Sequence, residues 1–502
     1  MTTTTTSRAA YVPPGDYRQL IGGDWTAAAR TFEAVDPSVG RPWATLPQGT
    51  EADVESAVAA ARRAFGAWGR TTPDKRQAAL LAIADRFERQ GERFAPLLAT
   101  ENGRPIREAF MADIPTVSAI FRFFAGVLHG LNGEQIPVAD PNTLVYTRCA
   151  PLGVIAAVLP WNSPLITFAN KVAPALAAGN TVVVKPSEYA SASILEFTRL
   201  IADLLPDGVL NVITGVGPET GAALVAHPDI AKITFTGGPA TARAILGAAG
   251  RTLTPSLMEL GGKGAMIVAA DADLECAVSD ALLGIYLANG EACIAASRLL
   301  VHESVHDEFV QRFAETARGI RVGDATDPAS EMGPLVSARH RDVVRGHLDR
   351  ARADGVRVIT GDEPLELPPG LEGGYYQRPV LLADPEGTAA ITRTEVFGPV
   401  TVVERYRDDQ EAVARANSTR YGLAAGVWTR DLRRAHLIAD QLEAGIIWIN
   451  RWFDLPPGMP MGGVGDSGFG RELSAQTLRE YTATKAVNID LGRERPALWN
   501  LS

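Results

Sequence analysis

The chain of 502 residues has few cysteines and no excess of basic charge. Its three cysteines, Cys149, Cys276 and Cys293, are an odd and sparse set, which excludes a disulfide-stabilised framework and fits a reducing compartment. The 58 acidic residues outnumber the 48 basic ones and give a net charge of −10. This balance argues against a partner that is a nucleic acid or an anionic membrane.

Long apolar runs are also missing from the sequence. No run approaches the ~18–20 residues that span a bilayer, so we expect a cytoplasmic protein that does not enter a membrane. The segment 1–10 is rich in threonine and lacks the apolar stretch of a signal peptide, and it is predicted to be a disordered tail. With 46% apolar residues, the remaining length can build two or three domains with sizeable cores.

Helical periodicity dominates the first third of the chain. Apolar residues recur every three or four positions from Glu51 to Trp68, which predicts an amphipathic helix. Thr72 and Pro73 form an N-cap and a first-turn proline for a second helix, and a third is predicted over 114–128. The extended segment 135–148 is predicted to be a hairpin that leaves the body of its domain.

From Gly153 onward, short β-branched runs alternate with helical stretches. This alternation predicts an α/β fold with parallel sheets, in which ligands bind beyond the carboxyl ends of the strands. Two such blocks are expected, joined near Leu260. The predicted strands are 154–159, 181–184, 210–213 and 232–236 in the first block and 265–268, 299–301 and 400–403 in the second, with helices near 274–287, 305–319 and 337–354.

Polar residues and glycines follow the predicted strands of the first block. Asn162 lies between two prolines after the first strand, where its amide can act as a donor. Lys185 and Glu188 follow the second strand and suit the hydroxyls of a ribose, while Gly237 and Gly238 open a helix that suits a pyrophosphate. Taken singly, Asn162 is better explained as a turn asparagine and Lys185 with Glu188 as a solvated charge pair, and the Gly-Gly turn alone is weak evidence.

Two further residues are candidates for chemistry. Glu259 ends an apolar strand before two glycines, and a carboxylate buried there would have a raised pKa and could act as a general base. Cys293 has small neighbours that leave room for a substrate to reach its sulfur. Cys149 and Cys276 are interpreted as packing residues, because a free cysteine behaves as a small apolar side chain.

The sequence also contains a zinc-like pattern from His302 to His306, H-E-x-x-H. Zinc binding requires both histidines on one helix face, but His302 directly follows a predicted strand. No third ligand is suggested by the other five histidines, so no metal site is predicted.

The order and spacing of these motifs resemble the NAD(P)-dependent aldehyde dehydrogenase superfamily from about Arg18 to Asp490. The matching stretches are Pro160–Asn162, Lys185–Glu188, Glu259–Lys263, Gly290–Ala295, Glu395–Pro399 and Ser467–Glu472. The resemblance implies two Rossmann-like parallel-sheet domains with a β oligomerisation arm. The NAD-binding domain would be 11–132 with 152–260, the catalytic domain 261–475, and the arm with a C-terminal extension 133–151 with 476–502.

The resemblance implies oxidation through a cysteine nucleophile. Cys293 would add to the aldehyde, and the Asn162 amide with the Cys293 backbone N–H would stabilise the oxyanion. After hydride transfer, Glu259 would activate water to release the acid from the thioester. Lys171 matches a family lysine that is linked to proton relay.

The resemblance also implies which residues of this chain bind the cofactor, namely those at the positions that bind it in the family. Glu188 favours NAD over NADP, because its charge would repel a 2′-phosphate. Gly238 stands where the family commonly has serine, and Ala242 where it commonly has glycine, so this chain departs from the family's pattern at the pyrophosphate contact and not at the ribose contacts. The implied cofactor residues are Trp161, Lys185, Ser187, Glu188, Gly217, Gly221, Thr236, Gly237, Gly238, Leu260, Glu395 and Phe397.

The implied substrate pocket is mostly apolar and favours a medium-sized aliphatic or aromatic aldehyde. Its residues are Ser163, Ile166, Asn170, Ala292, Ile294, Arg451, Phe453 and Met461. Arg451 leaves open a semialdehyde dehydrogenase for a carboxylated substrate. A CoA-acylating relative is the other alternative, although such relatives generally lack the glutamate that stands at 259. By resemblance, the expected assembly is a homodimer or a homotetramer.

Overall fold

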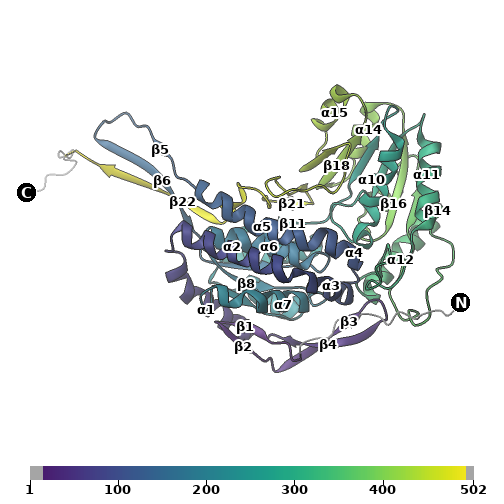
Figure 1. Ribbon diagram of the computed structural model, residues 1–502. Helices are drawn as coiled ribbons and strands as arrows, with labels where there is room; N and C mark the ends of the chain where they lie inside the picture. The colour runs from purple at the N-terminus through teal and green to yellow at the C-terminus, as the bar shows by residue number, and fades with distance from the viewer. Residues whose placement is uncertain (1–14, 493–502) are drawn as a thin grey trace, which may run out of the picture.

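The computed structural model describes residues 15–492, so the predicted tail at 1–10 and the end of the predicted C-terminal extension lie outside it. Two α/β bodies lie against each other, and a β arm projects from one of them (Figure 1). The predicted α/β class with parallel sheets is confirmed.

The first body is built on an eight-stranded sheet. Its centre is parallel, and the short strands at its two edges are antiparallel. In spatial order the strands are β2 (Asp24–Thr26), β1 (Gln19–Ile21), β9 (Leu210–Val212), β8 (Thr181–Lys185), β7 (Val154–Val158), β10 (Ile230–Thr236), β11 (Ser256–Glu259) and β21 (Gly468–Phe469).

Alternate residues of these strands face two separate cores. Ile155 and Val182 belong to one apolar cluster, and Ala156 and Val183 to the other, as the two-residue period of a strand requires. The first core includes helices α2 (Pro73–Gln90), α3 (Phe94–Asn102), α5 (Ile114–Val127), α6 (Pro164–Ala177) and α7 (Ala192–Ile201), and the second includes α1 (Glu51–Trp68), α8 (Ala222–Ala226) and α9 (Pro239–Thr252).

The second body is built on a seven-stranded sheet, parallel except at the edge strand β14. The order is β14 (Arg357–Thr360), β15 (Val380–Ala383), β16 (Val400–Tyr406), β13 (Arg298–His302), β12 (Ala265–Val268), β18 (Ala424–Trp428) and β19 (Ile446–Ile449). Its helices are α10 (Leu274–Tyr286), α11 (His306–Gly319), α12 (Ala338–Ala353), α13 (Ala390–Arg393), α14 (Asp409–Ala416) and α15 (Leu432–Ala439).

The helices predicted from periodicity and capping are confirmed. Thr50 caps α1 through a capping box with Asp53, and Thr72 accepts a hydrogen bond from the Lys75 N–H at the start of α2. All the predicted strands are present, within three residues at either end. Missing from the prediction were β1 and β2, the hairpin of β3 (Arg30–Asp36) and β4 (Arg41–Gln48), the strands β14, β15, β18 and β19, and the two-residue strands β17 (Tyr421–Gly422), β20 (Val464–Gly465) and β21.

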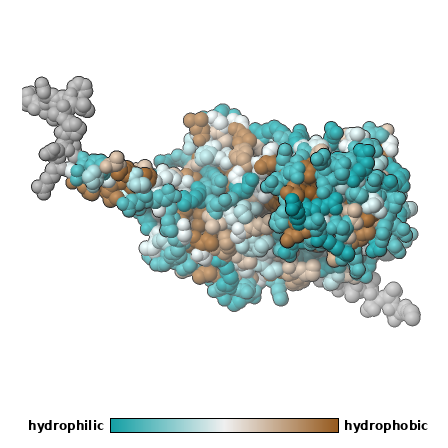
Figure 2. Space-filling view, turned by 90° about the horizontal axis from the view of Figure 1, so that it is seen from above, coloured by the Kyte–Doolittle hydropathy of each residue, from teal (hydrophilic) through white to brown (hydrophobic). Residues whose placement is uncertain are grey.

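The predicted hairpin at 135–148 is confirmed and has a third strand. β5 (Gln135–Ile136) pairs with β6 (Thr143–Pro151), which pairs along its whole length with β22 (Thr482–Asp490) from the chain's other end. This arm stands clear of both bodies (Figure 1). It carries exposed apolar side chains, seen as brown atoms in Figure 2: Ile136, Val138, Ile489 and Leu491.

One helical stretch corrects the expectation that no apolar run is long enough to span a bilayer. By length and composition alone, the stretch Ile106–Gly130 is long and apolar enough to cross a membrane. It comprises α4 (Ile106–Glu108), a π turn (Ala109–Asp113), α5 and a 3-10 turn (Leu128–Gly130). Its residues Val117, Ile120, Phe121 and Phe124 are fully buried in the core against α2 and α6. The apolar face that these four residues form therefore packs inside the protein.

Candidate active site

Cys293 lies on a tight loop between α10 and β13, here called the Cys293 loop (287–297). Ala288 and Asn289 have φ values of 52° and 58°, which cost energy in residues other than glycine. The Asn289 amide compensates by donating hydrogen bonds of 2.9 Å to the carbonyls of Gly103 and Pro334. The loop thus places Cys293 directly beside Gly262. A Cβ built on Gly262 would lie only 2.5 Å from the carbonyl oxygen of Cys293, so the contact requires a glycine.

The thiol of Cys293 is half-buried and close to two carboxyl groups. Burial raises its pKa to about 12, and the charges of Glu259 and Glu395 add to the effect. Without a nearby positive charge, the sulfur therefore stays protonated at neutral pH. Cys149 is half-buried in the arm and Cys276 is exposed on α10, so neither is close to this site.

Glu259 ends β11 and is almost fully buried, at 1% exposure. Neither of its carboxyl oxygens has a hydrogen-bond partner among residues 15–492. Burial and the neighbouring Glu472 carboxylate raise its pKa well above the ordinary value, while Lys171 and Arg471 oppose this shift. An unpartnered carboxyl group with a raised pKa is suited to exchange a proton with a substrate or a water molecule.

A buried ion pair lies next to Glu259. Lys171 Nζ on α6 donates to Glu472 Oε1 at 2.6 Å and to the Thr234 hydroxyl at 3.1 Å. The predicted relay lysine is thus paired with a carboxylate for which no individual role was predicted. The stretch Ser467–Glu472 was matched as a motif, but no local pattern indicates that Glu472 points toward α6.

The Asn162 amide contacts the Cys293 loop directly, donating to the carbonyl oxygen of Glu291 at 2.8 Å. The preceding residue is also fixed, since the Asn102 amide donates to the Trp161 carbonyl at 2.9 Å. The fold therefore brings together Asn162 and Cys293, which are 131 residues apart in the sequence. An amide held in this way can direct its second N–H toward a substrate oxygen.

Glu395 lies on the loop before β16, here called the Glu395 loop (394–399). Its Oε1 accepts a hydrogen bond of 2.9 Å from the Gly262 N–H, and a Cβ built on Gly261 would overlap the Glu395 carboxyl group in its present position. Burial raises the pKa of Glu395 to about 7, opposed by the charge of Lys263. The Lys263 ammonium is itself buried and unpartnered within the described residues, and burial lowers its pKa to about 7.

The predicted adenosine side lies at the carboxyl ends of β8, β9 and β10. Lys185 is buried and lies 3.7 Å from Glu188, which is one-third exposed. Gly217–Gly221 form a π turn whose last residue faces the Lys185 stem. Gly237 packs against the Phe235 ring. The space beside Gly238 is open: apart from the residues next to it in the chain, no atom of residues 15–492 lies within 4 Å of a Cβ built on Gly238.

The predicted substrate residues come from three segments. Ser163, Ile166 and Asn170 lie at the start of α6, Ala292 and Ile294 flank the cysteine, and Phe453 and Met461 lie in the chain after β19. Sequence reasoning missed the apolar neighbours Phe123, Leu455 and Met459; Met461 and Leu455 pack against the cores of both bodies. Arg451 is 60% exposed and pairs with Asp454 at 2.5 Å, so its charge is already engaged at the surface.

The zinc-like histidines do not share a helix face. His302 ends β13 and contacts Ser304, whereas His306 begins α11 and accepts a hydrogen bond from Arg405. No group of three potential metal ligands occurs within residues 15–492.

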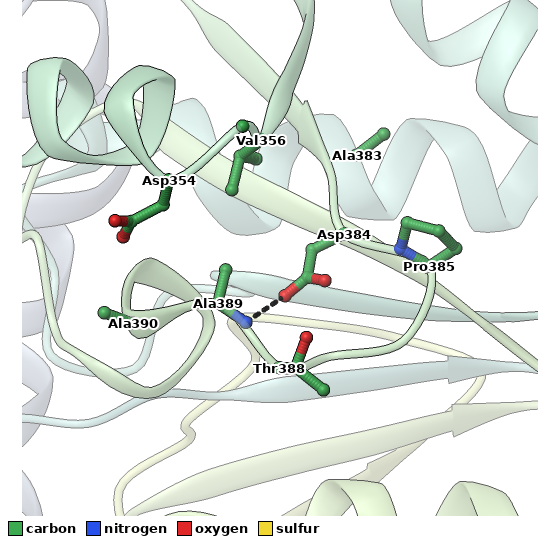
Figure 3. A pocket seen from close by; sticks show the side chains of 9 residues that line it. Asp354, Val356, Ala383, Asp384, Pro385, Thr388, Ala389 and Ala390 are labelled. Carbon is green, nitrogen blue, oxygen red and sulfur yellow. Dashed lines mark hydrogen bonds between the residues drawn. The ribbon is translucent and has the colours of Figure 1, made fainter.

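A separate hollow of about 390 Å³ lies at the C-terminal end of α12. Figure 3 shows Asp384 accepting a hydrogen bond from the Ala389 N–H at 2.8 Å, and the Thr392 hydroxyl also donates to it. None of the predicted site residues lines this hollow, and its carboxylate is already satisfied by its own loop.

Comparison with known proteins gives a consistent result. The model of the aldehyde dehydrogenase family matches residues 25–487. A curated relative, (Z)-2-((N-methylformamido)methylene)-5-hydroxybutyrolactone dehydrogenase of Acinetobacter baylyi, is 41% identical over 94% of this chain and 96% of its own.

Two solved structures show the same fold. PnpE from Pseudomonas sp. WBC-3 is 41% identical to this chain, and its crystal structure superposes with a TM-score of 0.93 over 96% of this chain and 99% of its own. PnpE has also been solved in complex with nicotinamide adenine dinucleotide. Betaine aldehyde dehydrogenase from Staphylococcus aureus, in complex with NAD+, is 34% identical with a TM-score of 0.94 and covers 96% of this chain and 97% of its own.

Proposed function

The chain belongs to the aldehyde dehydrogenase family, and we propose that it oxidises an aldehyde to the carboxylic acid with NAD through a covalent adduct on Cys293. The observation that carries this proposal is the convergence of the Cys293 thiol, the buried and unpartnered Glu259 carboxyl group and the Asn162 amide. No other cysteine of residues 15–492 has such neighbours.

Cys293 acts as the nucleophile. The Cys293 thiol gives its proton to solvent water, and the resulting thiolate sulfur forms a bond to the aldehyde carbon, which gives a thiohemiacetal with negative charge on the former carbonyl oxygen. The free N–H of the Asn162 amide and the Cys293 backbone N–H donate to that oxygen. The tight conformation of the Cys293 loop fixes both donors in advance, so little reorganisation is needed as the charge develops.

The residues at the β8, β9 and β10 ends fit a dinucleotide. The space beside Gly238 at the α9 N-terminus suits a phosphate, and the Thr236 hydroxyl is buried without a partner in the described residues. Lys185 and Glu188 would hold one ribose, and Glu395 with Phe397 the other. Bound NAD would supply the hydride acceptor for the thiohemiacetal carbon, which would leave a thioester on Cys293.

Glu259 completes the reaction. Its carboxylate takes a proton from water, whose oxygen attacks the thioester carbon while the Cys293 sulfur leaves as a thiolate. The proton can leave Glu259 toward Lys171 and Glu472, the adjacent buried pair. This carboxyl group also argues against transfer of the acyl group to CoA, because hydrolysis is its only evident task.

We infer a medium-sized aliphatic or aromatic aldehyde as substrate. The inference rests on the apolar Ile166, Ile294, Phe453 and Met461, and on the exposed pairing of Arg451 with Asp454. A carboxylated aldehyde is the second candidate, because a 5-hydroxylactone like that in the relative's name is the closed form of an aldehyde acid. Cytoplasmic location and assembly as a homodimer or homotetramer through the arm remain predictions.

An aldehyde panel with NAD and NADP tests the proposal. Short aliphatic, longer aliphatic, aromatic and carboxylated aldehydes should be compared by kcat/KM from NADH formation, with an Arg451→Met variant beside the wild type. We expect the apolar aldehydes to be preferred and the variant to change no ranking. A carboxylated substrate that is preferred by the wild type and lost in the variant would support the second candidate, and no NADH formation with any aldehyde would overturn the proposed function.

A further inference from the structure

His340 lies where three segments of the site meet. It occupies the first turn of α12, whose start is fixed because the Ser337 hydroxyl accepts a hydrogen bond from the His340 N–H at 3.1 Å. The preceding Val336 N–H donates to the Glu291 carboxyl group at 3.0 Å, which joins α12 to the Cys293 loop. The imidazole is therefore held on a rigid base.

The imidazole contacts the Glu395 loop through a short hydrogen bond. His340 Nε2 lies 2.7 Å from the carbonyl oxygen of Phe397. A carbonyl oxygen can only accept, so Nε2 carries the proton. Phe397 has a φ of 57°, an unfavourable value for a bulky residue, and such a conformation persists only where neighbouring groups enforce it. The Nε2–H group of the His340 ring is one of those neighbouring groups.

Aromatic packing extends the contact to the segment that carries Asn162. The ring of Trp161 lies 5.3 Å from that of His340 and 5.4 Å from that of Phe397, and the His340 and Phe397 rings are 6.1 Å apart. The three rings thus form one cluster, in edge-on contacts that are favourable for aromatic pairs. Trp161 directly precedes Asn162, so the cluster also supports the amide that contacts the Cys293 loop.

Burial keeps the His340 imidazole neutral at neutral pH. Burial lowers its pKa, and the Phe397 carbonyl opposes the shift only in part. The Glu291 carboxyl group on the Cys293 loop lies 3.6 Å from Nε2, and His347 lies two turns further along α12. A neutral ring with a single N–H serves as a fixed donor.

We propose that His340 is a positioning residue that holds the Glu395 loop against the Cys293 loop, and so sets the conformation in which the nicotinamide half of the cofactor is bound. The inference rests on the proposed function, in which Glu395 and Phe397 contact that half. Without His340, Phe397 would relax from its unfavourable φ, and the loop would have to be ordered again each time NAD binds.

Three variants of His340 test this role. His340→Leu removes the donor, His340→Asn keeps an amide that is too short to reach the Phe397 carbonyl, and His340→Gln places an amide N–H near the position of Nε2. We expect the first two to raise the KM for NAD by about tenfold with the KM for the aldehyde nearly unchanged, since about tenfold corresponds to one lost hydrogen bond. His340→Gln should restore the KM for NAD to within about threefold of wild type.

His347→Gln is the matched control, because it removes another imidazole from the same helix and should leave both KM values unchanged. The Asn and Gln variants keep the test valid if the Leu variant does not fold. A KM for NAD at the wild-type value in folded Leu or Asn variants would overturn the inference alone, as would a Gln variant as impaired as the Asn variant. A wild-type protein without NAD-dependent activity would instead overturn the proposed function, and this inference with it.

Discussion

Lys171 Nζ lies 2.6 Å from Glu472 Oε1, and both side chains are fully buried although 301 residues separate them. A buried ion pair of this kind is costly to break, because the remaining charge is left without compensation. The pair also lies against Glu259, whose pKa is raised by Glu472 and lowered by Lys171. It therefore connects the stability of the site with the proton affinity of the proposed base.

Removal of Lys171 should reduce both stability and activity. We expect Lys171→Met to lower the free energy of unfolding by about 3 kcal/mol, measured by urea denaturation, because the Glu472 carboxylate loses its partner. Arg62→Met breaks an exposed pair with Asp229 and should cost less than about 1 kcal/mol. Equal costs for the two variants would show that the buried pair has no special role.

Replacement of Glu259 should slow release of the acid rather than formation of NADH. In Glu259→Gln we expect a rapid burst of NADH equivalent to the enzyme, followed by turnover about 100-fold or more below wild type, as expected on loss of a general base. Glu303→Gln, in the zinc-like pattern, is the control and should behave as wild type. A Glu259→Gln enzyme with a normal steady-state rate and no accumulated acyl-enzyme would contradict the assigned role.

The same residue should determine the acid limb of the pH profile. Burial and Glu472 raise the pKa of Glu259, so its basic form is lost as the pH falls through a value above the ordinary carboxyl range. The wild-type deacylation rate should therefore decline at a higher pH than an unperturbed glutamate would allow. In Glu259→Gln this limb should be absent, and a limb that persists there would belong to another group.

The pKa of Cys293 makes a second prediction about pH. Because burial and two carboxyl groups raise it to about 12, the rate of alkylation by iodoacetamide in the absence of NAD should rise about tenfold for each pH unit from neutral pH, with no plateau before pH ~10. Peptide mapping separates this rate from that of the exposed Cys276. A plateau near pH 8 for Cys293 would show that the thiol is already activated without cofactor.

Cofactor choice should depend on Glu188. Its carboxylate is one-third exposed beside Lys185, where it would repel a 2′-phosphate. We expect Glu188→Gln to raise kcat/KM for NADP by about tenfold and to lower that for NAD, with exposed Glu275→Gln on α10 as the control. If the ratio of kcat/KM for NAD to that for NADP is unchanged in Glu188→Gln, then Glu188 does not contact the adenosine ribose.

Local patterns predicted much of the fold. Capping at Thr50 and Thr72 and the helical period marked α1 and α2, and β-branched runs marked β7, β8 and β10. The strands that were missed have a different cause. β19 is only four residues long, and β17, β20 and β21 have two each, so their pairing depends on neighbours in space that no local pattern reveals.

The site was predictable only in part for the same reason. Cys293, Glu259 and Asn162 follow strand ends or stand in small-residue loops, and both features are visible in the sequence. The contacts of Glu472 with Lys171 and of His340 with Phe397 depend on tertiary packing, and their sequence neighbours give no sign of them. The surface position of Arg451 likewise emerged only from its pairing with Asp454.

The most direct test of the account compares single cysteine variants. NADH formation from the preferred aldehyde should be measured for wild type, Cys293→Ala, Cys276→Ala and Cys149→Ala at equal concentrations of folded enzyme. We predict that Cys293→Ala loses activity by at least about 1000-fold, as expected when a covalent nucleophile is removed, whereas the other two keep most of it. NADH formation by Cys293→Ala at a rate close to wild type would contradict the mechanism.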